Sequence, residues 1–336
     1  MKPLRVGVLG VGRIGAMHAD LVHHRVADAV VGGVFDVHAP GAAAVGGSLD
    51  VPVFASASEL IASDDIDVVA ICSSTDTHID LLVEAATAGK PIFCEKPLSL
   101  SLDEVDRGLA AVEAAGVPLH VGFNRRFDAS HRAVRDAAAG GTLGELRQVH
   151  ITSRDPGPPP ISYIEVSGGI FLDMTIHDFD MARYVVGSEV VEVYARGAVK
   201  VDAAIGEAGD LDTVTVVLTH ENGVVTTIDN CRQAAYGYDQ RVEAFGSLGV
   251  ATSENQLDHS MVLRGVDGGA TAKVQHFFLD RYIPSYVEQW TEVLDAFRSG
   301  GPTPVTGADG RAPLVMGVAT WRSFREGRPV RLEEIG

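Results

Sequence analysis

The stretch VGVLGVGRIG, residues Val6 to Gly15, decides the fold of this chain, because an apolar strand runs directly into three spaced glycines. Gly10 permits the tight turn after the strand, since glycine adopts a positive φ without steric cost. Gly12 lets the backbone approach a pyrophosphate, and Gly15 lets helix and strand pack closely. The first N–H groups of the following helix then face the anion. The stretch therefore predicts the turn of a dinucleotide-binding βαβ unit.

A carboxylate after the next predicted strand supports this interpretation. The strand is expected at Ala29–Phe35, and Asp36 follows it, 21 residues after Gly15. At that spacing an acidic side chain can accept hydrogen bonds from the ribose hydroxyls of the adenosine. Its charge repels a 2′-phosphate, so the sequence favours NAD over NADP, although a protonated His38 would weaken the preference. The alternative is a strand–turn–helix connection without a ligand.

Length and composition narrow the class of protein. A chain of 336 residues indicates two domains, and 46% hydrophobic with 21% charged residues is typical of a soluble, core-forming protein. The net charge of −18 argues against nucleic acid or an anionic membrane as partner. Cys72, Cys94 and Cys231 form no C-x-x-C pair, so we expect neither a metal site nor disulfides. With no visible signal peptide or membrane-length apolar stretch, a cytoplasmic location is predicted.

The first third of the chain alternates strands and helices, which predicts a doubly wound parallel sheet over residues 1–122. Such a sheet is covered on both faces, and the almost wholly apolar strand Ile66–Cys72 fits this. The predicted elements are the strands Leu4–Leu9, Ala29–Phe35, Ile66–Cys72, Pro91–Cys94 and Pro118–Val121 and the helices Ile14–His23, His78–Ala88 and Leu102–Ala115.

After about residue 145 the pattern changes to strands with few helices between them. This predicts a second domain of α+β type over residues 123–304, with a mostly antiparallel sheet and helices near Gly169–Val186 and Ser285–Ser299. The Pro-rich segment 155–160 is expected to be a rigid loop. A further helix at Asp309–Glu326, within a tail of about 305–336, is expected to pack back on the first domain. The predicted strands are Leu146–Ser153, Val190–Val199, Asp212–Thr219, Val224–Asn230 and Arg241–Phe245.

A second motif, Phe93-Cys-Glu95-Lys96-Pro97, stands at the end of a predicted parallel strand. Ligands of open α/β sheets bind at the carboxyl ends of the strands, so Lys96 is placed to reach the reactive end of a dinucleotide. Its ammonium would stabilise an alkoxide as it forms. The Lys96–Pro97 peptide is a candidate for the cis form. The alternative is a surface ion pair between Glu95 and Lys96.

The third motif begins at Gly168 and contains Asp173-Met-Thr-Ile-His177. On one regular helix these two residues share a face, and near a helix start the dipole keeps the Asp173 side chain ionised. The pair suits general-base chemistry, in which the imidazole takes a hydroxyl proton and the carboxylate stabilises the imidazolium. The alternative is a capped helix with a half-buried histidine. A metal site is disfavoured, because Asp178 and Asp180 do not share that face.

Polar and aromatic residues in turn-like segments form a candidate substrate lining. Asn124-Arg125-Arg126-Phe127 follows the last parallel strand, and Tyr236-Gly-Tyr238 and Arg281-Tyr282 lie further along. Recognition of a polyol needs many fixed hydrogen-bond donors and acceptors, which these side chains provide. Each tyrosine is equally consistent with a core ring whose hydroxyl reaches the surface.

Together and in this order, these motifs resemble the Gfo/Idh/MocA oxidoreductase family over essentially the whole chain. The family markers are the Gly10–Gly15 turn, Glu95-Lys96-Pro97 and Asp173-x-x-x-His177. Further stretches resemble those of the inositol 2-dehydrogenases in this family: Gly122–Asp128, Arg154–Tyr163, Gly168–Asp180, Tyr236–Arg241 and Phe277–Tyr282.

The resemblance implies an N-terminal Rossmann domain and a C-terminal α+β domain with an open, mostly antiparallel sheet. It implies NAD as cofactor, a small-molecule polyol as substrate and a homotetramer built through the open sheet faces. The implied reaction is oxidation of a ring hydroxyl of myo-inositol to 2-keto-myo-inositol (scyllo-inosose). Another cyclitol or an aldohexose, such as scyllo-inositol or a glucose-type sugar, is an alternative substrate. A cofactor-bound regulator without catalysis is disfavoured, because a pure binder needs no base.

The family pattern also implies roles for individual residues. Some relatives are expected to carry a neutral amide where this chain has Asp155, and a carboxylate only accepts hydrogen bonds, so this substrate contact departs from theirs. The implied catalytic residues are Lys96, Asp173 and His177; the substrate-binding residues are Arg125, Asp155, Tyr236 and Tyr282; the cofactor-binding residues are Gly10, Gly12, Arg13, Ile14, Gly15, Asp36, Ser73, His78, Glu95 and Lys96.

Overall fold

The computed structural model describes residues 2–336, which form two compact units of two segments each. Unit 1 extends to Asn124 and includes Pro284–Ala312; unit 2 consists of Arg125–Ile283 and Pro313–Gly336. This division differs from the predicted one in its C-terminal part. The helix predicted at 285–299 belongs to unit 1, because its apolar residues enter the core of that unit. The last helix was expected to pack on the first domain, but it belongs to unit 2 from Pro313 onward. Only its first residues, up to Ala312, belong to unit 1.

Unit 1 contains a five-stranded, wholly parallel sheet in the order β2-β1-β3-β4-β5, as the alternating pattern predicted. The strand order reverses between β1 and β3, and ligands of such sheets bind at this reversal, outside the carboxyl ends of the strands. The central strand β3 is buried along its whole length. The strands are β1 (Leu4–Leu9), β2 (Ala29–Phe35), β3 (Val68–Ile71), β4 (Ile92–Cys94) and β5 (Leu119–Val121).

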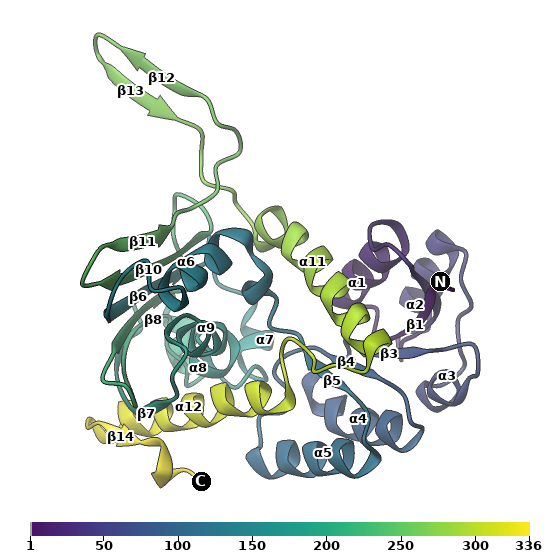
Figure 1. Cartoon of the computed structure of the whole chain (residues 1–336). Helices are drawn as coiled ribbons and strands as arrows, with labels where there is room; N and C mark the ends of the chain where they lie inside the picture. Colours follow the sequence, from purple (N-terminus) through teal and green to yellow (C-terminus); the bar gives the residue numbers. More distant parts are fainter. Residues whose placement is uncertain (1) are drawn as a thin grey trace. The chain divides into compact units, whose positions relative to one another are not determined.

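Helices cover this sheet, and Figure 1 shows α4 and α5 packed side by side. The helix α2 was not predicted, because its sequence APGAAAVGGSL is rich in glycine, a poor helix former. It forms because Ala42, Gly46 and Leu49 are buried. The helical segments are α1 (Arg13–His24), α2 (Ala39–Leu49), α3 (Ala57–Ala62), η1 (Thr75–Thr77), α4 (His78–Thr87), α5 (Leu102–Ala115) and α11 (Phe278–Ser299), which belongs to unit 1 from Pro284.

Unit 2 contains a seven-stranded sheet in the order β11-β10-β6-β9-β8-β7-β14. Only β6 and β9 pair in parallel, so the predicted mostly antiparallel sheet is confirmed. Gly223, with φ of 84°, lies in the tight hairpin turn between β8 and β9. The strands are β6 (Leu146–Arg154), β7 (Val190–Ala198), β8 (Thr213–His220), β9 (Val225–Cys231), β10 (Asp239–Gly246), β11 (Val250–Ser253) and β14 (Val330–Arg331).

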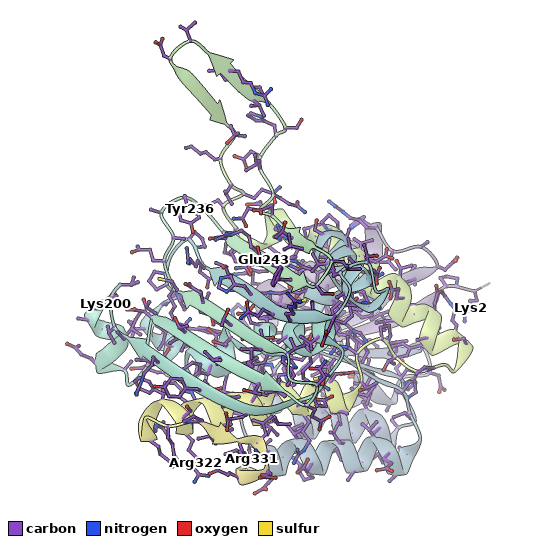
Figure 2. All side chains as sticks on the ribbon, turned by 60° about the vertical axis from the view of Figure 1, so that its left-hand side comes forward. Lys2, Lys200, Tyr236, Glu243, Arg322 and Arg331 are labelled. Atoms are coloured by element: carbon purple, nitrogen blue, oxygen red, sulfur yellow. The ribbon has the colours of Figure 1, made fainter. Side chains whose placement is uncertain are left out.

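One face of this sheet packs against helices and the other is open. Residues alternate along β8 and β9, so Val216 and Ile228 enter the core whereas Val217 and Thr227 lie on the open face. Figure 2 brings the open face into view, with Glu243 of β10 labelled. The helical segments of unit 2 are η2 (Asn124–Phe127, from Arg125), α6 (Ala129–Ala139), α7 (Ile161–Ile164), α8 (Ile170–Asp173), α9 (Ile176–Val186), α10 (Ala203–Glu207), α12 (Gly307–Glu326, from Pro313) and η3 (Leu332–Glu334).

A two-stranded ribbon of β12 (Val262–Gly265) and β13 (Gly268–Thr271) projects from the body of unit 2 (Figure 1). Every residue of both strands is exposed, and the strands were not predicted, because their short glycine-containing sequences carry no alternating pattern. Among the helices of residues 2–336, none has the length and apolar character needed to cross a bilayer.

Candidate active site

The glycine turn of unit 1 has the geometry that its sequence predicts. Gly10 has φ of 84°, and a Cβ on Gly15 would lie 1.8 Å from the carbonyl oxygen of Gly10, so only glycine fits there. A Cβ on Gly12 would meet no atom within 4 Å, so space is open beside this backbone. Arg13 and Ile14 open α1, and the free N–H groups of this helix start face the same space. The turn therefore fits a dinucleotide pyrophosphate.

Asp36 is held at this turn by two backbone donors. Its Oδ2 accepts a hydrogen bond from the Val11 N–H at 2.7 Å, and its Oδ1 accepts one from the His38 N–H at 2.8 Å. A carboxylate has about four acceptor positions, so each oxygen retains capacity for a further donor. The side chain is thus fixed and still able to accept from ribose hydroxyls, as NAD requires.

His78 ties together two loops at the carboxyl edge of the parallel sheet. Its Nδ1 lies 2.9 Å from the carbonyl oxygen of Pro97, and its Nε2 lies 3.0 Å from that of Ser73. A neutral imidazole has one N–H and donates to one of them at a time. Burial lowers the pKa of His78, although the two carbonyls act in the opposite direction. The predicted cofactor residues Ser73 and His78 therefore lie together.

Lys96 follows β4 at the same edge, and its peptide bond to Pro97 is cis. The surface ion pair that was the alternative interpretation is absent: no partner of the Lys96 ammonium is found in the described chain, 2–336. The Glu95 carboxylate instead accepts from His18 Nε2 at 2.9 Å and from the Lys96 backbone N–H at 3.1 Å. The ammonium is left available for a ligand.

In unit 2, the helix predicted to carry both Asp173 and His177 is interrupted. α8 ends at Asp173 and α9 begins at Ile176. The Thr175 N–H bonds to the carbonyl of Ile170, five residues back, which is a wide turn rather than a regular α-helical one. The prediction of one regular helix over 169–186 was therefore wrong, and Asp173 is the last residue of a single-turn helix rather than a residue near the start of a long one.

Asp173 is fixed instead by side chains distant in sequence. Its Oδ1 accepts from the Tyr163 hydroxyl at 2.9 Å, and its Oδ2 accepts from Arg232 at 3.0 Å. Arg232 is 1% exposed and also donates to Asp210 at 3.1 Å. Asp210 in turn accepts from the N–H of Ile170, the first residue of α8. One buried guanidinium thus anchors both ends of this short helix.

Arg125 is buried and held by residues that the sequence did not single out for this role. It donates to Asp178 at 2.7 Å and to Ser153 at 2.9 Å. The other Asp178 oxygen accepts from Asn230 at 2.7 Å. These polar residues are nearly inaccessible to solvent, and their mutual hydrogen bonds satisfy them. The Arg125 guanidinium therefore has a fixed position.

Asp155 lies among these charges but has no side-chain hydrogen bond within the described residues. Burial raises the pKa of Asp155 to about 6, the Asp173 carboxylate adds to this effect, and Arg125 and Arg232 partly offset it. A carboxylate without a partner in a cluster of fixed charges is suited to accept hydrogen bonds from a polyol.

The two candidate tyrosines lie in different surroundings. Tyr282 is 2% exposed, and the Arg125 guanidinium lies 5.8 Å from its ring centre. Tyr236 is 52% exposed at the rim of unit 2 (Figure 2), and its hydroxyl accepts from Arg154 at 3.0 Å and donates to Asp239.

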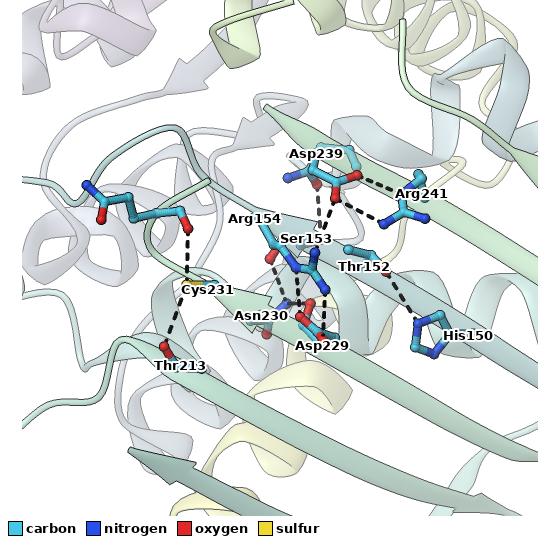
Figure 3. Close-up of polar contacts among 12 residues, drawn as sticks. His150, Thr152, Ser153, Arg154, Thr213, Asp229, Asn230, Cys231, Asp239 and Arg241 are labelled. Carbon is cyan, nitrogen blue, oxygen red and sulfur yellow. Dashed lines mark hydrogen bonds and ion pairs between the residues drawn. The ribbon is translucent and has the colours of Figure 1, made fainter. Parts of the chain in front are cut away.

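Figure 3 shows the polar contacts of Arg154 and Asp239, in which Arg154 also pairs with Asp229 and Arg241 pairs with Asp239. Tyr238 is the residue found next to Tyr282 instead. Its buried ring lies at right angles to that of Tyr282, with centres 6.0 Å apart. The structure therefore groups Arg125, Asp155 and Tyr282 and does not bring the Tyr236 hydroxyl to them.

Sequence reasoning missed Arg232 and Tyr163 as members of this cluster; it named Tyr238 in the candidate substrate lining but assigned the binding role to Tyr236. The only signal for Arg232 is a charged residue directly after an alternating strand, which is common on protein surfaces. The described part of the chain contains no cluster of histidine, cysteine or carboxylate side chains that could hold a metal ion.

The comparisons with known proteins cover nearly the whole chain. Residues 4–123 match the family model described as oxidoreductase family, NAD-binding Rossmann fold, and residues 131–252 match the GFO/IDH/MocA C-terminal domain. The chain is 46% identical to the myo-inositol 2-dehydrogenase of Thermotoga maritima, over 99% of both chains. It is 33% identical to the scyllo-inositol 2-dehydrogenase (NAD(+)) of Bacillus subtilis, over 98% of this chain and 96% of the relative.

A solved structure agrees with these matches. The crystal structure of a myo-inositol dehydrogenase from Corynebacterium glutamicum has a TM-score of 0.94 at 37% identity, and 98% of this chain covers 99% of that one. The glycine turn and Asp36 supply a fit for NAD that agrees with the first family model. The chain therefore belongs to the Gfo/Idh/MocA family of NAD-dependent oxidoreductases.

Proposed function

We propose that this protein oxidises a ring hydroxyl of myo-inositol to 2-keto-myo-inositol. The observation that carries this proposal is the full-length similarity to relatives and solved structures that are named inositol dehydrogenases. The cluster of Arg125, Asp155 and Tyr282 supports it, because fixed donors and acceptors of this kind suit a polyol.

The proposed catalytic residues are Lys96, Asp173 and His177. NAD, when bound, accepts the hydride from the reacting carbon. His177 removes the hydroxyl proton as general base, and the Lys96 ammonium stabilises the developing alkoxide. Asp173, which Arg232 and Tyr163 fix, supplies the negative charge that stabilises the imidazolium of His177. Arg125, Asp155 and Tyr282 bind the other hydroxyls, and Tyr236 is retained as a fourth candidate.

A panel of polyols and sugars, followed at the absorbance of NADH, tests this function. We expect turnover with myo-inositol and NAD, and much less with NADP. A clear preference for scyllo-inositol, another cyclitol or an aldohexose would change the substrate assignment but not the type of reaction. The similarity to the scyllo-inositol dehydrogenase favours scyllo-inositol as the second candidate substrate. Absence of hydride transfer with every polyol would favour a regulatory protein instead.

We also infer a homotetramer built through the open sheet faces of unit 2. Val217 on β8 and Thr227 on β9 lie on this face as partly buried β-branched residues. Sheets that face only water usually carry polar side chains there, so a covering copy accounts for the valine. A cytoplasmic location agrees with Cys72, Cys94 and Cys231, which are all free thiols.

A further inference from the structure

An unbroken line of hydrogen bonds in unit 1 leads from α11 to the backbone of Lys96. The indole Nε1–H of Trp290 donates to His18 Nδ1 at 2.9 Å. His18 Nε2 lies 2.9 Å from Glu95 Oε1, and the Lys96 N–H donates to Glu95 Oε2 at 3.1 Å. Figure 1 shows α11 alongside α1, the helix that carries His18.

The chemistry of the first donor sets the direction of every bond in this line. An indole nitrogen only donates, so His18 Nδ1 must be the bare, accepting nitrogen. The proton of the neutral ring is therefore on Nε2, which donates to Glu95. Both oxygens of the Glu95 carboxylate accept, one from an imidazole and one from a peptide N–H. Trp290 thus selects the tautomer of His18.

Packing leaves these side chains little freedom. His18 and Trp290 are fully buried, and the Trp290 ring stacks on Phe93 with centres 4.4 Å apart. The Glu95 carboxylate lies against Gly122, where a Cβ would stand 2.8 Å from Oε1. Displacing any member therefore disturbs a close-packed site.

We propose that His18 and Trp290 are positioning residues for Lys96. They orient the Glu95 carboxylate toward the backbone N–H of Lys96. In this position the carboxylate fixes the Lys96 backbone and does not pair with the Lys96 ammonium. Without them, a buried carboxylate beside a lysine with no counter-ion would attract that ammonium. The proposal rests on the proposed role of Lys96 in stabilising the alkoxide, and it assigns to α11 a function in the reaction besides packing.

The tautomer of His18 is a direct test that needs no substrate. Long-range ¹H–¹⁵N NMR of the full-length protein distinguishes a protonated from a bare ring nitrogen. We expect His18 with a proton on Nε2 and a bare Nδ1 in the wild type, and loss of this fixed pattern in Trp290→Phe. A wild-type ring protonated on Nδ1 would overturn the proposal, even if the polyol panel revealed no activity.

Kinetics of Trp290→Phe test the link to Lys96. Phenylalanine retains an aromatic ring to stack on Phe93 and removes only the donor. We expect kcat and kcat/KM to fall together by about tenfold, as for an interaction made in the transition state, while the Kd of NAD changes less than about twofold. An unchanged kcat in a variant that has lost the fixed tautomer would show that the line does not position Lys96.

Trp321→Phe is the matched control, because the chain has two tryptophans. The Trp321 indole donates to the carbonyl of Gly168 at 3.2 Å, in unit 2. We expect this variant to retain the tautomer of His18 and kcat. Equal loss of kcat in both variants would assign the effect to general destabilisation and overturn the proposal. If Trp290→Phe does not fold, the tautomer of His18 in the wild-type protein still tests the proposal.

Discussion

Asp155, in the charge cluster of unit 2, should make the stability of the folded protein depend on pH. Its pKa of about 6 in the folded protein lies above the ordinary 3.8 because of burial and the neighbouring Asp173 carboxylate. Between about pH 4 and 6 the native state therefore holds a proton that the unfolded chain has lost. Stability from this residue is fully present below pH 4 and is lost as pH rises through 6.

Replacement of Asp155 by asparagine should remove this pH dependence. An asparagine does not titrate, so the wild type should lose about 3 kcal/mol of unfolding free energy relative to Asp155→Asn between pH 4 and 7. Urea unfolding of both proteins at several pH values measures the difference. Parallel stability curves for the two proteins would show that Asp155 titrates normally.

His177 carries the clearest residue-level prediction of the proposed mechanism. General-base catalysis contributes about 10²–10⁴ in rate, so His177→Ala should lower kcat at least about a hundredfold. The Kd of NAD, measured by titration of protein fluorescence, should not change, because the residue is not in the predicted cofactor set. A variant with nearly normal turnover would exclude His177 as the base.

The partners of Asp173 mark the limit of what sequence predicts at this scale. The four-residue spacing to His177 identified both residues as candidates, but the side chains that hold the carboxylate come from elsewhere. Arg232 lies 59 residues away, directly after β9, so the pairing depends on the place of β9 in the sheet. Similarly, Tyr236 and Tyr238 are two residues apart, and only the packing decides which one lies beside Tyr282. Contacts between distant segments are not encoded in local spacing.

At the scale of elements, local patterns predicted the first unit better than the second. β1, β2 and α5 have the predicted bounds, because an apolar strand run or a serine cap is a signal within a few residues. The break between α8 and α9 was missed because Thr175 bonds back to the Ile170 carbonyl and to Asn230 of β9, and the latter contact depends on the tertiary fold. A threonine that competes for backbone carbonyls distorts a helix.

Two alanine substitutions in the glycine turn should affect different properties, one the binding of NAD and the other the stability of the fold. Gly12→Ala adds a Cβ to open space, so stability should change little, but a bound pyrophosphate would meet the methyl group and the Kd of NAD should rise at least about tenfold. Gly15→Ala forces a methyl group against the Gly10 carbonyl, so unfolding should become easier by about 3 kcal/mol or more.

Thermal unfolding and NAD titration of both variants provide the comparison, each serving as the control for the other. If Gly12→Ala bound NAD as tightly as the wild type, the pyrophosphate would not lie over this turn.

For the whole molecule, the sequence predicted two domains but misassigned their C-terminal parts. Sequential order suggested that 123–304 would form one domain, whereas the chain returns to unit 1 at Pro284 and to unit 2 at Pro313. Trp290 and Val293 lie in the core of unit 1, and Met316 and Ala319 lie in that of unit 2. An amphipathic pattern predicts that a helix packs against a hydrophobic core, but it does not indicate which of two cores the helix joins.

The open sheet of unit 2 yields the prediction for the assembly. Thr227 lies near the middle of β9 on this face, and its hydroxyl lies 2.6 Å from the Nδ1 of His150 on β6. If a second copy covers the face, Thr227→Arg places a charge without a partner inside the interface, which costs several kcal/mol. Thr87→Arg, at an exposed position on α4, is the control for the added charge.

Light scattering of the purified protein should give four times the chain mass of 35.4 kDa for the wild type and Thr87→Arg, and a smaller species for Thr227→Arg. Unit 2 should remain folded in the variant, because the substituted side chain points away from the core and the strand keeps its backbone ladder. A wild-type monomer, or a Thr227→Arg protein that stays tetrameric, would mean that this face is not the interface. In that case a partner other than a second copy would have to cover the half-buried valines on β8 and β9, because a wide exposed face of β-branched residues tends to associate with other proteins.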